Sequence, residues 1–299
     1  MPIMPTMKVL ILEPTYAEYA NGLGNRSRVV ERLVAIESKA FQPDLDKLHE
    51  TAGDFDTVFI CNPNNPTGVL LTHGKLLHLC RQHPDVRFII DESYLPFVPQ
   101  GHLYSMAAAG LPNVIVLQSF SKIFRLPGLR LGYMIAPKRM IESSRRTMPP
   151  WSMSSLIEPA MDYFAGHQQN IQRFIAESRS EIQKEKIRFQ ESIDAIPGLS
   201  CFASVTSFVL IRLPASIDAQ RTCDGLAQRR ILIRNCANFF GLGDQFIRIS
   251  IKESEANTRI ANLLSKVVDD ACENGFVTPA SKKPTAASAA VAPSGLYPV

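Results

Sequence analysis

Three short polar segments in the first half of the chain carry residue types that could do chemistry. They are NPNNPTG (62–68), DESY (91–94) and SFSK (119–122), and Arg130 follows the last of them. The first two segments directly follow a run of apolar residues that is typical of a buried strand, and SFSK follows such a run after Gln118. In parallel sheets, chemistry collects beyond the carboxyl ends of the strands, so we expect these side chains to meet at one rim. Each feature alone could be only a turn, a helix cap or a surface charge, but the whole set in this order is not expected by chance.

Pyridoxal phosphate (PLP) is a cofactor that needs such a set of groups. Its aldehyde requires a lysine amine, for which Lys122 is the candidate, and its ring nitrogen requires a carboxylate, for which Asp91 is the candidate. Asn65 and Tyr94 can hydrogen-bond the phenolate oxygen, and Tyr16 can stack on the ring face. The phosphate requires hydroxyl donors and a cation, for which the candidates are Ser119, Ser121 and Arg130. We predict a PLP site in which Lys122, Asp91 and Tyr94 are the catalytic residues.

The segments NPNNPTG, DESY and SFSKIFRLPGLRLGY resemble the class I/II aminotransferases of PLP fold type I. The resemblance covers residues 9–270 and is greatest to the branch of histidinol-phosphate aminotransferases and threonine-phosphate decarboxylases. Residues 230–242 and the segment FIRIS (246–250) are similar to the C-terminal lobe of that branch. The segments MPPWS (148–152) and PTYAEY (14–19) are more similar to the decarboxylase of cobalamin biosynthesis.

The resemblance implies roles for two arginines near the C-terminus. Arg248 would bind the α-carboxylate of the substrate, and Arg234 would bind the substrate phosphate. Both residues lie on predicted strands, and each offers a planar fork of donors that suits a carboxylate or a phosphate. Taken alone, each could equally be a solvated surface charge.

Two reactions stay open on the sequence. Both begin when the substrate amine displaces Lys122. If the bond from the α-carbon to hydrogen is then perpendicular to the cofactor ring, a histidinol-phosphate-type aminotransferase results. If the bond to the carboxylate is perpendicular, carbon dioxide leaves and the enzyme is a decarboxylase of a phosphorylated amino acid such as threonine phosphate. The motif likeness favours the decarboxylase.

The N-terminus departs from the family pattern. Relatives carry, before the PTY segment, an arm and a small-residue loop whose backbone N–H groups hold the cofactor phosphate at a helix start. Here the chain begins only a few residues before that strand, so we expect an incomplete phosphate site and one missing strand. A homologue with little or no activity therefore stays an alternative. The resemblance also implies a homodimer, because sites of this fold type form between subunits.

The elements expected to position these groups form an α/β fold with a mainly parallel sheet and a smaller α+β C-terminal domain. Strands are predicted at 8–13, 29–36, 57–61, 87–90, 114–117, 131–136, 208–213, 231–234 and 246–251. Helices are predicted at 72–83, 168–193 and 256–271, and one more between the strands 208–213 and 231–234. The expected organisation is a large domain (7–150), linking helices (151–195), a small domain (196–273) and a disordered Ala/Pro/Ser/Lys tail (274–299).

The composition limits the class of protein. The chain has 299 residues, of which 45% are hydrophobic and 20% charged, as in an ordinary globular protein. Its net charge of +4 does not argue for nucleic acid as a partner. No apolar run approaches the roughly 18–20 residues that span a bilayer, and the N-terminus is not a secretory signal. We therefore expect a cytoplasmic protein whose partner is a small phosphorylated amino acid, and not nucleic acid or a membrane.

Cysteine, histidine and glycine patterns do not indicate another kind of site. No two cysteines form a C-x-x-C pair, so reduced and mostly buried thiols are expected, with no metal. His73, His78 and His83 recur every five residues, which on a helix turns about 140° per step, so we interpret them as diverging surface residues. The Gly-Leu-Gly segments at 22–24 and 241–243 lack the third glycine of a dinucleotide fingerprint, which disfavours a nucleotide-binding protein without PLP.

Overall fold

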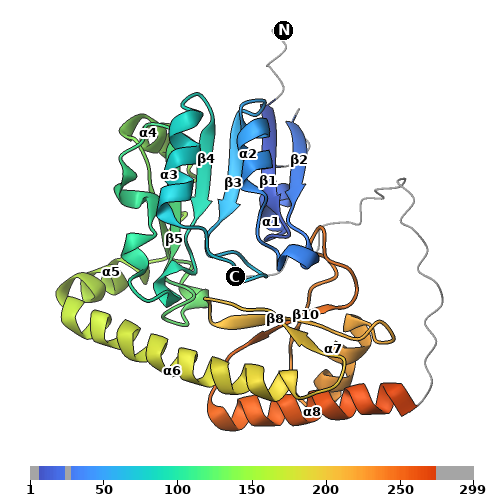
Figure 1. Cartoon of the computed structure of the whole chain (residues 1–299). Helices are drawn as coiled ribbons and strands as arrows, with labels where there is room; N and C mark the ends of the chain where they lie inside the picture. The colour runs from blue at the N-terminus through green and yellow to red at the C-terminus, as the bar shows by residue number, and fades with distance from the viewer. Residues whose placement is uncertain (1–6, 24–27, 274–299) are drawn as a thin grey trace.

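The computed structural model describes residues 7–23 and 28–273, which form two sheets that each carry helices (Figure 1). We call residues 7–147, around the first sheet, the large lobe, and residues 200–273, around the second, the small lobe. None of the described helices is long and apolar enough to cross a bilayer. The tail predicted to be disordered, 274–299, lies outside the described residues.

The sheet of the large lobe is parallel except at one edge. Its strands are β1 (Met7–Glu13), β2 (Arg28–Val34), β3 (Thr57–Cys61), β4 (Arg87–Asp91), β5 (Val114–Ser119) and β6 (Gly132–Ile135). The strand order is β2-β1-β3-β4-β5-β6, and only β6 runs antiparallel to its neighbour. The register pairs Cys61 with Asp91 and Asp91 with Leu117, so these strand ends meet at one rim. The predicted α/β class with a mainly parallel sheet is confirmed.

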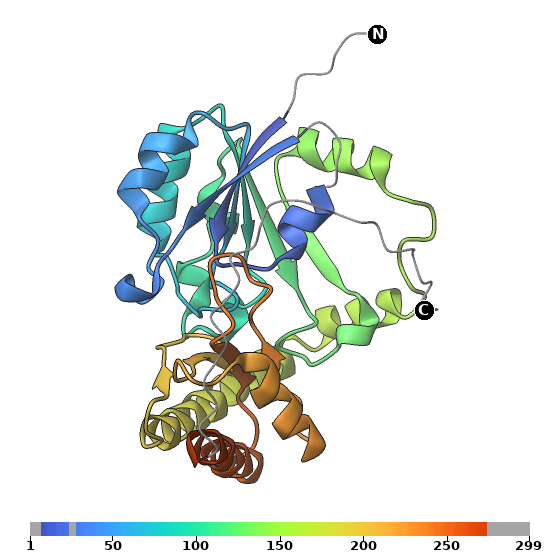
Figure 2. The same cartoon turned by 90° about the vertical axis from the view of Figure 1, so that its right-hand side faces the viewer.

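Helices cover both faces of this sheet (Figure 2). The helices of the large lobe are α1 (Glu18–Leu23), α2 (Leu45–Ala52), α3 (His73–Gln82) and α4 (Lys138–Thr147). Figure 2 shows α2 and α3 on one face, and α1 and α4 on the other. Leu48 of α2 and Leu76 of α3 are fully buried against sheet residues such as Phe88. The sequence predicted α3, whereas α1, α2 and α4 were missed.

The small lobe stacks a four-stranded sheet on helices. Between the lobes run α5 (Ile157–Gly166) and the long helix α6 (Gln168–Asp194), which passes beneath both sheets (Figure 1). The elements of the small lobe are β7 (Ser200–Cys201), β8 (Phe208–Arg212), α7 (Ala219–Gln228), β9 (Arg234–Asn235), β10 (Phe246–Ser250) and α8 (Ser254–Glu273). The strand order is β7-β8-β10-β9, and all pairs are antiparallel.

Side chains alternate along the strands of the small sheet. Those that point to the helices form a buried core with α6 and α8, and include Val209, Ile211, Ile247 and Ile249. The other face is turned toward the large lobe, where Leu210 and Phe246 pack on Phe41. Because Arg248 alternates with Ile247 and Ile249, it lies on this second face. The substrate arginine that the resemblance implies therefore faces the large lobe.

The predicted strand 231–234 is wrong in its first three residues. The chain reverses at Arg230, which has a φ of 61°, and only Arg234 and Asn235 pair with β10. Ile231 packs on the core of the small lobe while Leu232 is 88% exposed. The apolar pattern here reflects packing at the end of a helix, with no partner strand alongside.

The interpretation of the histidines is also corrected. The rings of His78 and His83 do not diverge, because both contact the ring of His49 from α2, at centre distances of 5.0 and 5.7 Å. His83 lies beyond the end of α3, so the helical angle did not apply to it. His73 lies apart, with Nδ1 3.1 Å from the carbonyl oxygen of Ser105. Within the described part of the chain, no three ligating side chains are arranged to hold a metal ion.

Two glycines allow the lobes to approach closely. Gly68, in the NPNNPTG segment, has a φ of +71°, and a Cβ there would overlap Oγ of Ser204 and lie 2.9 Å from its Cα. Gly241 has a φ of +85°, and a Cβ there would lie 2.6 Å from Cγ1 of Val34. The backbone N–H of Val205 also donates to the carbonyl of Gly68 at 3.1 Å. The second Gly-Leu-Gly segment thus has a packing role between the lobes.

We expect Gly68→Ala to lower the free energy of unfolding by about 2 kcal/mol, because it adds both left-handed strain and a clash. Gly74→Ala is the matched control, since Gly74 lies in α3 with nothing within 4 Å of its Cβ position. That change should be neutral or stabilising by up to about 1 kcal/mol. Urea unfolding of both variants measures the difference, and equal midpoints would contradict the role of Gly68.

Candidate active site

The carboxyl ends of β3, β4 and β5 open into a pocket of about 360 Å³ that is lined by residues of the large lobe. Eight of the ten predicted site residues line it, and they are Tyr16, Asn65, Asp91, Tyr94, Ser119, Ser121, Lys122 and Arg130. The other lining residues include Tyr19, Cys61 and Ser93. The structure thus brings together side chains that are more than a hundred residues apart in the sequence.

Lys122 follows β5 in a tight turn. The backbone N–H of Ser121 donates to Oγ of Ser119 at 3.1 Å and shapes this turn. Nζ of Lys122 lies 5.8 Å from the ring centre of Tyr94. Burial lowers the pKa of Lys122 from its usual value, and the positive charge of Arg248 lowers it further. A larger share of the amine is therefore neutral near pH 7, which a nucleophile or a proton acceptor requires.

Asp91 is oriented by two hydrogen bonds at the end of β4. The hydroxyl of Tyr19 donates to Oδ2 at 2.7 Å, and the backbone N–H of Ser93 donates to Oδ1 at 2.8 Å. Burial raises the pKa of Tyr19 well above its usual value, and nearby Cys61 and Asp91 raise it further, so the phenol keeps its proton and is the donor. These bonds leave lone pairs on both carboxylate oxygens for a further donor.

Tyr19 is the residue of this site that sequence reasoning missed. It lies in α1, three residues after Tyr16, and the two rings meet edge to face at 5.6 Å. Its ring also stacks on Phe59 of β3 at 5.5 Å, which aims the hydroxyl at Asp91. The signal that could have revealed it is the helical spacing of the two tyrosines, which places them on neighbouring positions of one turn. The ring of Tyr16 is 47% exposed at the pocket mouth, where it could cover a bound ring.

We expect Tyr19→Phe to weaken the binding of PLP about tenfold, because the change removes one hydrogen bond to a charged carboxylate and keeps the ring packing. Equilibrium titration of the purified protein with PLP measures this change. Tyr163→Phe is the control, since it removes a hydroxyl from an exposed tyrosine of α5. Equal dissociation constants for the two variants would show that Tyr19 does not orient Asp91 for the cofactor.

Arg248 joins the small lobe to the pocket. Its Nη1 donates to Oδ1 of Asn65, and its guanidinium lies 4.7 Å from the ring centre of Phe208. Phe208 in turn meets the ring of Tyr94 edge to face at 5.0 Å. Burial raises the pKa of Tyr94, and the charge of Arg248 partly offsets this effect. Because Arg248 occupies the carbonyl side of the Asn65 amide, the NH₂ group of Asn65 is left to donate to a ligand.

Arg234 lies directly opposite Arg248 in the register of β9 and β10, so both side chains leave the same face of the small sheet. Nη2 of Arg234 donates to Oδ1 of Asn238 at 2.8 Å, and the guanidinium lies 5.4 Å from the ring centre of Phe239. Neither arginine lines the pocket itself, but Arg248 contacts the lining residue Asn65, whereas Arg234 is exposed. The two arginines thus form an inner and an outer cationic position.

Ser119, Ser121 and Arg130 also line the pocket. Arg130 has a left-handed φ of 53°, and its Nη1 is 3.4 Å from the carbonyl of Pro127. This long contact leaves most donors of the guanidinium to other partners. Two hydroxyls and one guanidinium are a donor set that suits a phosphate.

The residues present fit PLP. A lysine amine, an oriented carboxylate, an exposed aromatic ring and a phosphate-binding donor set surround one pocket. The Nε of Arg248, whose Nη1 bonds the lining residue Asn65, is buried and has no hydrogen-bond partner among the described residues. A buried donor without a partner is costly, which indicates that a ligand acceptor completes it.

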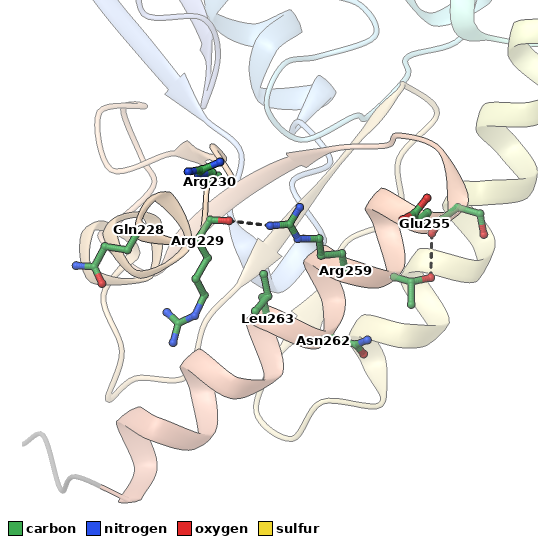
Figure 3. A pocket seen from close by; sticks show the side chains of 9 residues that line it. Gln228, Arg229, Arg230, Glu255, Arg259, Asn262 and Leu263 are labelled. Carbon is green, nitrogen blue, oxygen red and sulfur yellow. Dashed lines mark hydrogen bonds between the residues drawn. The ribbon is translucent and has the colours of Figure 1, made fainter.

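A larger hollow of about 1120 Å³ lies on the small lobe, between the end of α7 and the first half of α8 (Figure 3). It contains none of the predicted site residues. Two of its arginines donate hydrogen bonds to backbone carbonyls at the C-terminal end of α7. Nη2 of Arg259 donates to the carbonyl of Arg229 at 3.0 Å, as Figure 3 shows, and Nη1 of Arg229 donates to the carbonyl of Gly225 at 2.9 Å. The chemistry therefore identifies the smaller pocket as the candidate site.

Comparison with known proteins agrees with this geometry. The chain is 29% identical over 270 residues to threonine-phosphate decarboxylase of Salmonella typhimurium. The aligned region covers 87% of this chain and 71% of the relative. It is 25% identical over 262 residues to histidinol-phosphate aminotransferase of Methanocaldococcus jannaschii. This alignment covers 87% of this chain and 69% of that relative. The structure of histidinol-phosphate aminotransferase from Clostridium acetobutylicum superposes with a TM-score of 0.80 at 29% identity, covering 89% of this chain and 79% of that one. The family model for aminotransferase class I and II matches residues 1–264, and the chain belongs to this family.

Proposed function

We propose that this chain is a PLP-dependent decarboxylase of a phosphorylated amino acid, of the L-threonine O-3-phosphate type. The observation that carries the proposal is the pair formed by Arg248 and Arg234, which lie opposite each other on the face of the small sheet turned toward the large lobe. A phosphorylated amino acid has two anionic groups at opposite ends of a short molecule. Two guanidinium groups, one inner and one outer, suit a carboxylate near the cofactor and a phosphate farther out.

The cofactor is pyridoxal phosphate, and its binding would use the pocket residues in distinct roles. When bound, it supplies an aldehyde that captures an amine and a ring that accepts the electron pair of a broken bond. Asp91, oriented by Tyr19, would hold a proton at the ring nitrogen. Tyr16 would cover one ring face and keep water from it, and the NH₂ group of Asn65 would donate to the phenolate oxygen.

Lys122 would carry the proton transfer. Its amine lines the pocket, and burial lowers its pKa from the usual value, which makes the neutral amine that accepts a proton more accessible. In decarboxylation, Lys122 would deliver a proton to the substrate α-carbon in place of the departing carbon dioxide. In this reaction one amino acid and one proton give one amine and one carbon dioxide, so no second substrate is required.

A histidinol-phosphate-type aminotransferase is the second candidate, because the solved aminotransferase from Clostridium acetobutylicum has the same 29% identity as the decarboxylase relative. Both candidates place a phosphate on Arg234. They differ in the bond to the α-carbon that Arg248 and the pocket hold perpendicular to the cofactor ring. An aminotransferase would require an oxo acid as the acceptor of the amino group, which gives a simple experimental distinction.

We expect Arg234→Gln to lower kcat/KM for O-phosphothreonine about 10- to 100-fold, because a charge-assisted contact to the phosphate is lost. The same variant should leave the much slower turnover of unphosphorylated threonine unchanged, and this substrate serves as the control. Carbon dioxide release from both substrates measures the effect. An equal loss for both would contradict the assignment of Arg234 to the phosphate.

We also propose that the chain acts as a homodimer. Exposed apolar side chains gather after α4, where Trp151 is 98% exposed and Met153 and Leu156 are more than 60% exposed. Contiguous exposed apolar residues of this kind usually mark an interface. Light scattering tests the proposal, since a monomer has a mass of 33.2 kDa and Trp151→Ser should shift a dimer toward that mass.

A further inference from the structure

A buried carboxylate outside the candidate pocket links both lobes to the loop that carries Tyr16. Glu13 is the last residue of β1 and is only 4% exposed. Its Oε2 accepts the backbone N–H of Thr15 at 2.6 Å, and its Oε1 lies 3.5 Å from Nε of Arg32 on β2. None of the roles assigned to the pocket uses Glu13. Because burying an acid is costly, a fold that keeps one needs a reason for it.

Glu13 has two partners, and each of them contacts a different part of the structure. On one side, Thr15 directly precedes Tyr16, and its Oγ1 donates to Oδ1 of Asn64 at 2.8 Å. Nδ2 of Asn64 donates to the carbonyl of Pro14 at 2.8 Å, which ties this loop to the segment that contains Asn65. The conformation of the loop therefore depends on the hydrogen bond that Glu13 accepts.

On the other side, Arg32 reaches the small lobe. Its guanidinium lies 4.4 Å from the ring centre of Phe240, which belongs to the loop between β9 and β10. This contact has the geometry of a cation–π interaction. Glu13 and Arg32 thus connect the loop of Tyr16 to the loop that follows Arg234.

We propose that Glu13 is a positioning residue which, through Arg32 and Phe240, couples the placement of Tyr16 over the cofactor to the position of the small lobe. The inference rests on the proposed function only in taking the pocket as the PLP site. Glu13 does not line the candidate pocket. It acts through the Thr15 N–H, which it holds more strongly as a carboxylate than as a neutral acid.

The charge of Glu13 changes near neutral pH. Burial raises its pKa to about 7, although the hydrogen bond from Thr15 and the charge of Arg32 oppose this rise. The ionisable groups that face Glu13 in the described part of the chain are Arg32 from β2 and Cys61 from β3, which lines the same small cavity. Burial raises the pKa of Cys61 to about 12, so its thiol stays neutral. The coupling is therefore strongest above pH 7, where Glu13 is ionised.

Titration of the purified apoprotein with PLP at pH 6 and pH 8 tests the proposal. At pH 8 we expect Glu13→Gln to weaken PLP binding about fivefold relative to the wild type, since a charge-assisted hydrogen bond becomes a neutral one. At pH 6 the two proteins should agree within about twofold, because the wild-type acid then holds its proton and resembles Gln. Glu31→Gln, which neutralises an exposed acid next to Arg32, is the control and should change neither value.

The connection to the small lobe is tested by a double-mutant cycle with Phe240→Leu. At pH 8 this change should weaken PLP binding about twofold in the wild type and have no further effect in Glu13→Gln. A Glu13→Gln effect that is the same at both pH values, or additive effects of the two changes, would overturn the coupling. Failure of the wild type itself to bind PLP would overturn the proposed function, and this inference with it.

Urea unfolding provides a readout that does not depend on the cofactor. The folded-state pKa of Glu13 is raised from 4.5 to about 7, so the folded protein binds more protons than the unfolded chain between these values. Proton uptake by Glu13 therefore favours the folded state. Its contribution to the free energy of unfolding is complete below about pH 4.5 and is lost as the pH rises through about 7. We expect Glu13→Gln to flatten this part of the pH profile and Glu31→Gln to leave it unchanged. A Glu13→Gln profile parallel to that of the wild type would contradict the burial of an ionisable acid at this position.

Discussion

Lys122→Ala is expected to abolish the covalent attachment of PLP and to lower kcat at least about 10³-fold. Lys122 is the lysine that lines the pocket together with Asp91, and its Nζ lies 5.8 Å from the ring centre of Tyr94. Removing a positioned proton carrier alone costs about 10²–10⁴ in rate, and the variant also loses the attachment point. Borohydride reduction followed by peptide mass spectrometry identifies the attached residue, and product release gives the rate.

The matched control for this change is Lys75→Ala, which removes an exposed lysine of α3 that does not line the pocket. It should retain the attached cofactor and full activity. A Lys122→Ala protein that still carries reduced cofactor on a lysine, or that keeps more than about a tenth of the wild-type rate, would show that another amine performs this role.

Arg248→Ala is expected to lower kcat/KM for the phosphorylated amino acid about 10²- to 10³-fold, while Arg248→Lys recovers only part of this loss. The alanine change removes a planar fork that binds a carboxylate and leaves the carbonyl of Asn65 without its donor. A lysine restores the charge but cannot form two parallel hydrogen bonds. Steady-state kinetics at several substrate concentrations measures the loss.

The same change should also raise the pKa of Lys122. The charge of Arg248 is, after burial, the largest effect that lowers this pKa. Without it, less of the amine is neutral at pH 7, so the rate at which PLP attaches to the apoprotein should reach its maximum at a higher pH. Arg139→Ala, an exposed change on α4, is the control. An unchanged pH profile for Arg248→Ala would contradict the electrostatic link between the two residues.

The rim of the pocket could be predicted because its residues follow strands that are easy to recognise. The runs before Asn62, Asp91 and Ser119 are continuous and apolar, which is the pattern of strands buried on both faces. Parallel strands present their carboxyl ends at one edge, so the convergence of these segments follows from the topology. The resemblance then assigned a role to Arg248, whose strand β10 alternates plainly between the helical core and the other face.

Other parts of the site depend on contacts that no local pattern encodes. Tyr19 acts on Asp91 only because the short helix α1 packs on Phe59, 40 residues farther along the chain. The bond between Arg248 and Asn65 spans 183 residues and requires the two lobes to be docked. Glu13 appeared to be only the end of a strand, because its partner Arg32 and the ring of Phe240 meet through tertiary packing. Local periodicity carries no information on such pairs.

Helices without strong signals were missed for a related reason. None of the residues of α4 is buried, and its sequence KRMIESSRRT has only Met140 and Ile141 as apolar residues, which are too few to reveal a helix by periodicity. In contrast, α2 is short and depends on the cap that Asp44 provides by accepting the N–H of Lys47. At 231–234 the sequence predicted a strand where most of the residues form none. Ile231 and Ile233, after the end of α7, pack on the core of the small lobe without a neighbouring strand.

The central claim is that this chain breaks the bond between the α-carbon and the carboxylate of a phosphorylated amino acid. The most direct test is to incubate the PLP-loaded protein, without any oxo acid, with O-phosphothreonine labelled at the carboxyl carbon. We predict labelled carbon dioxide and an equal amount of the phosphorylated amine, and neither product from Lys122→Ala. No labelled carbon dioxide, together with transfer of the amino group of histidinol phosphate to an oxo acid, would contradict the claim.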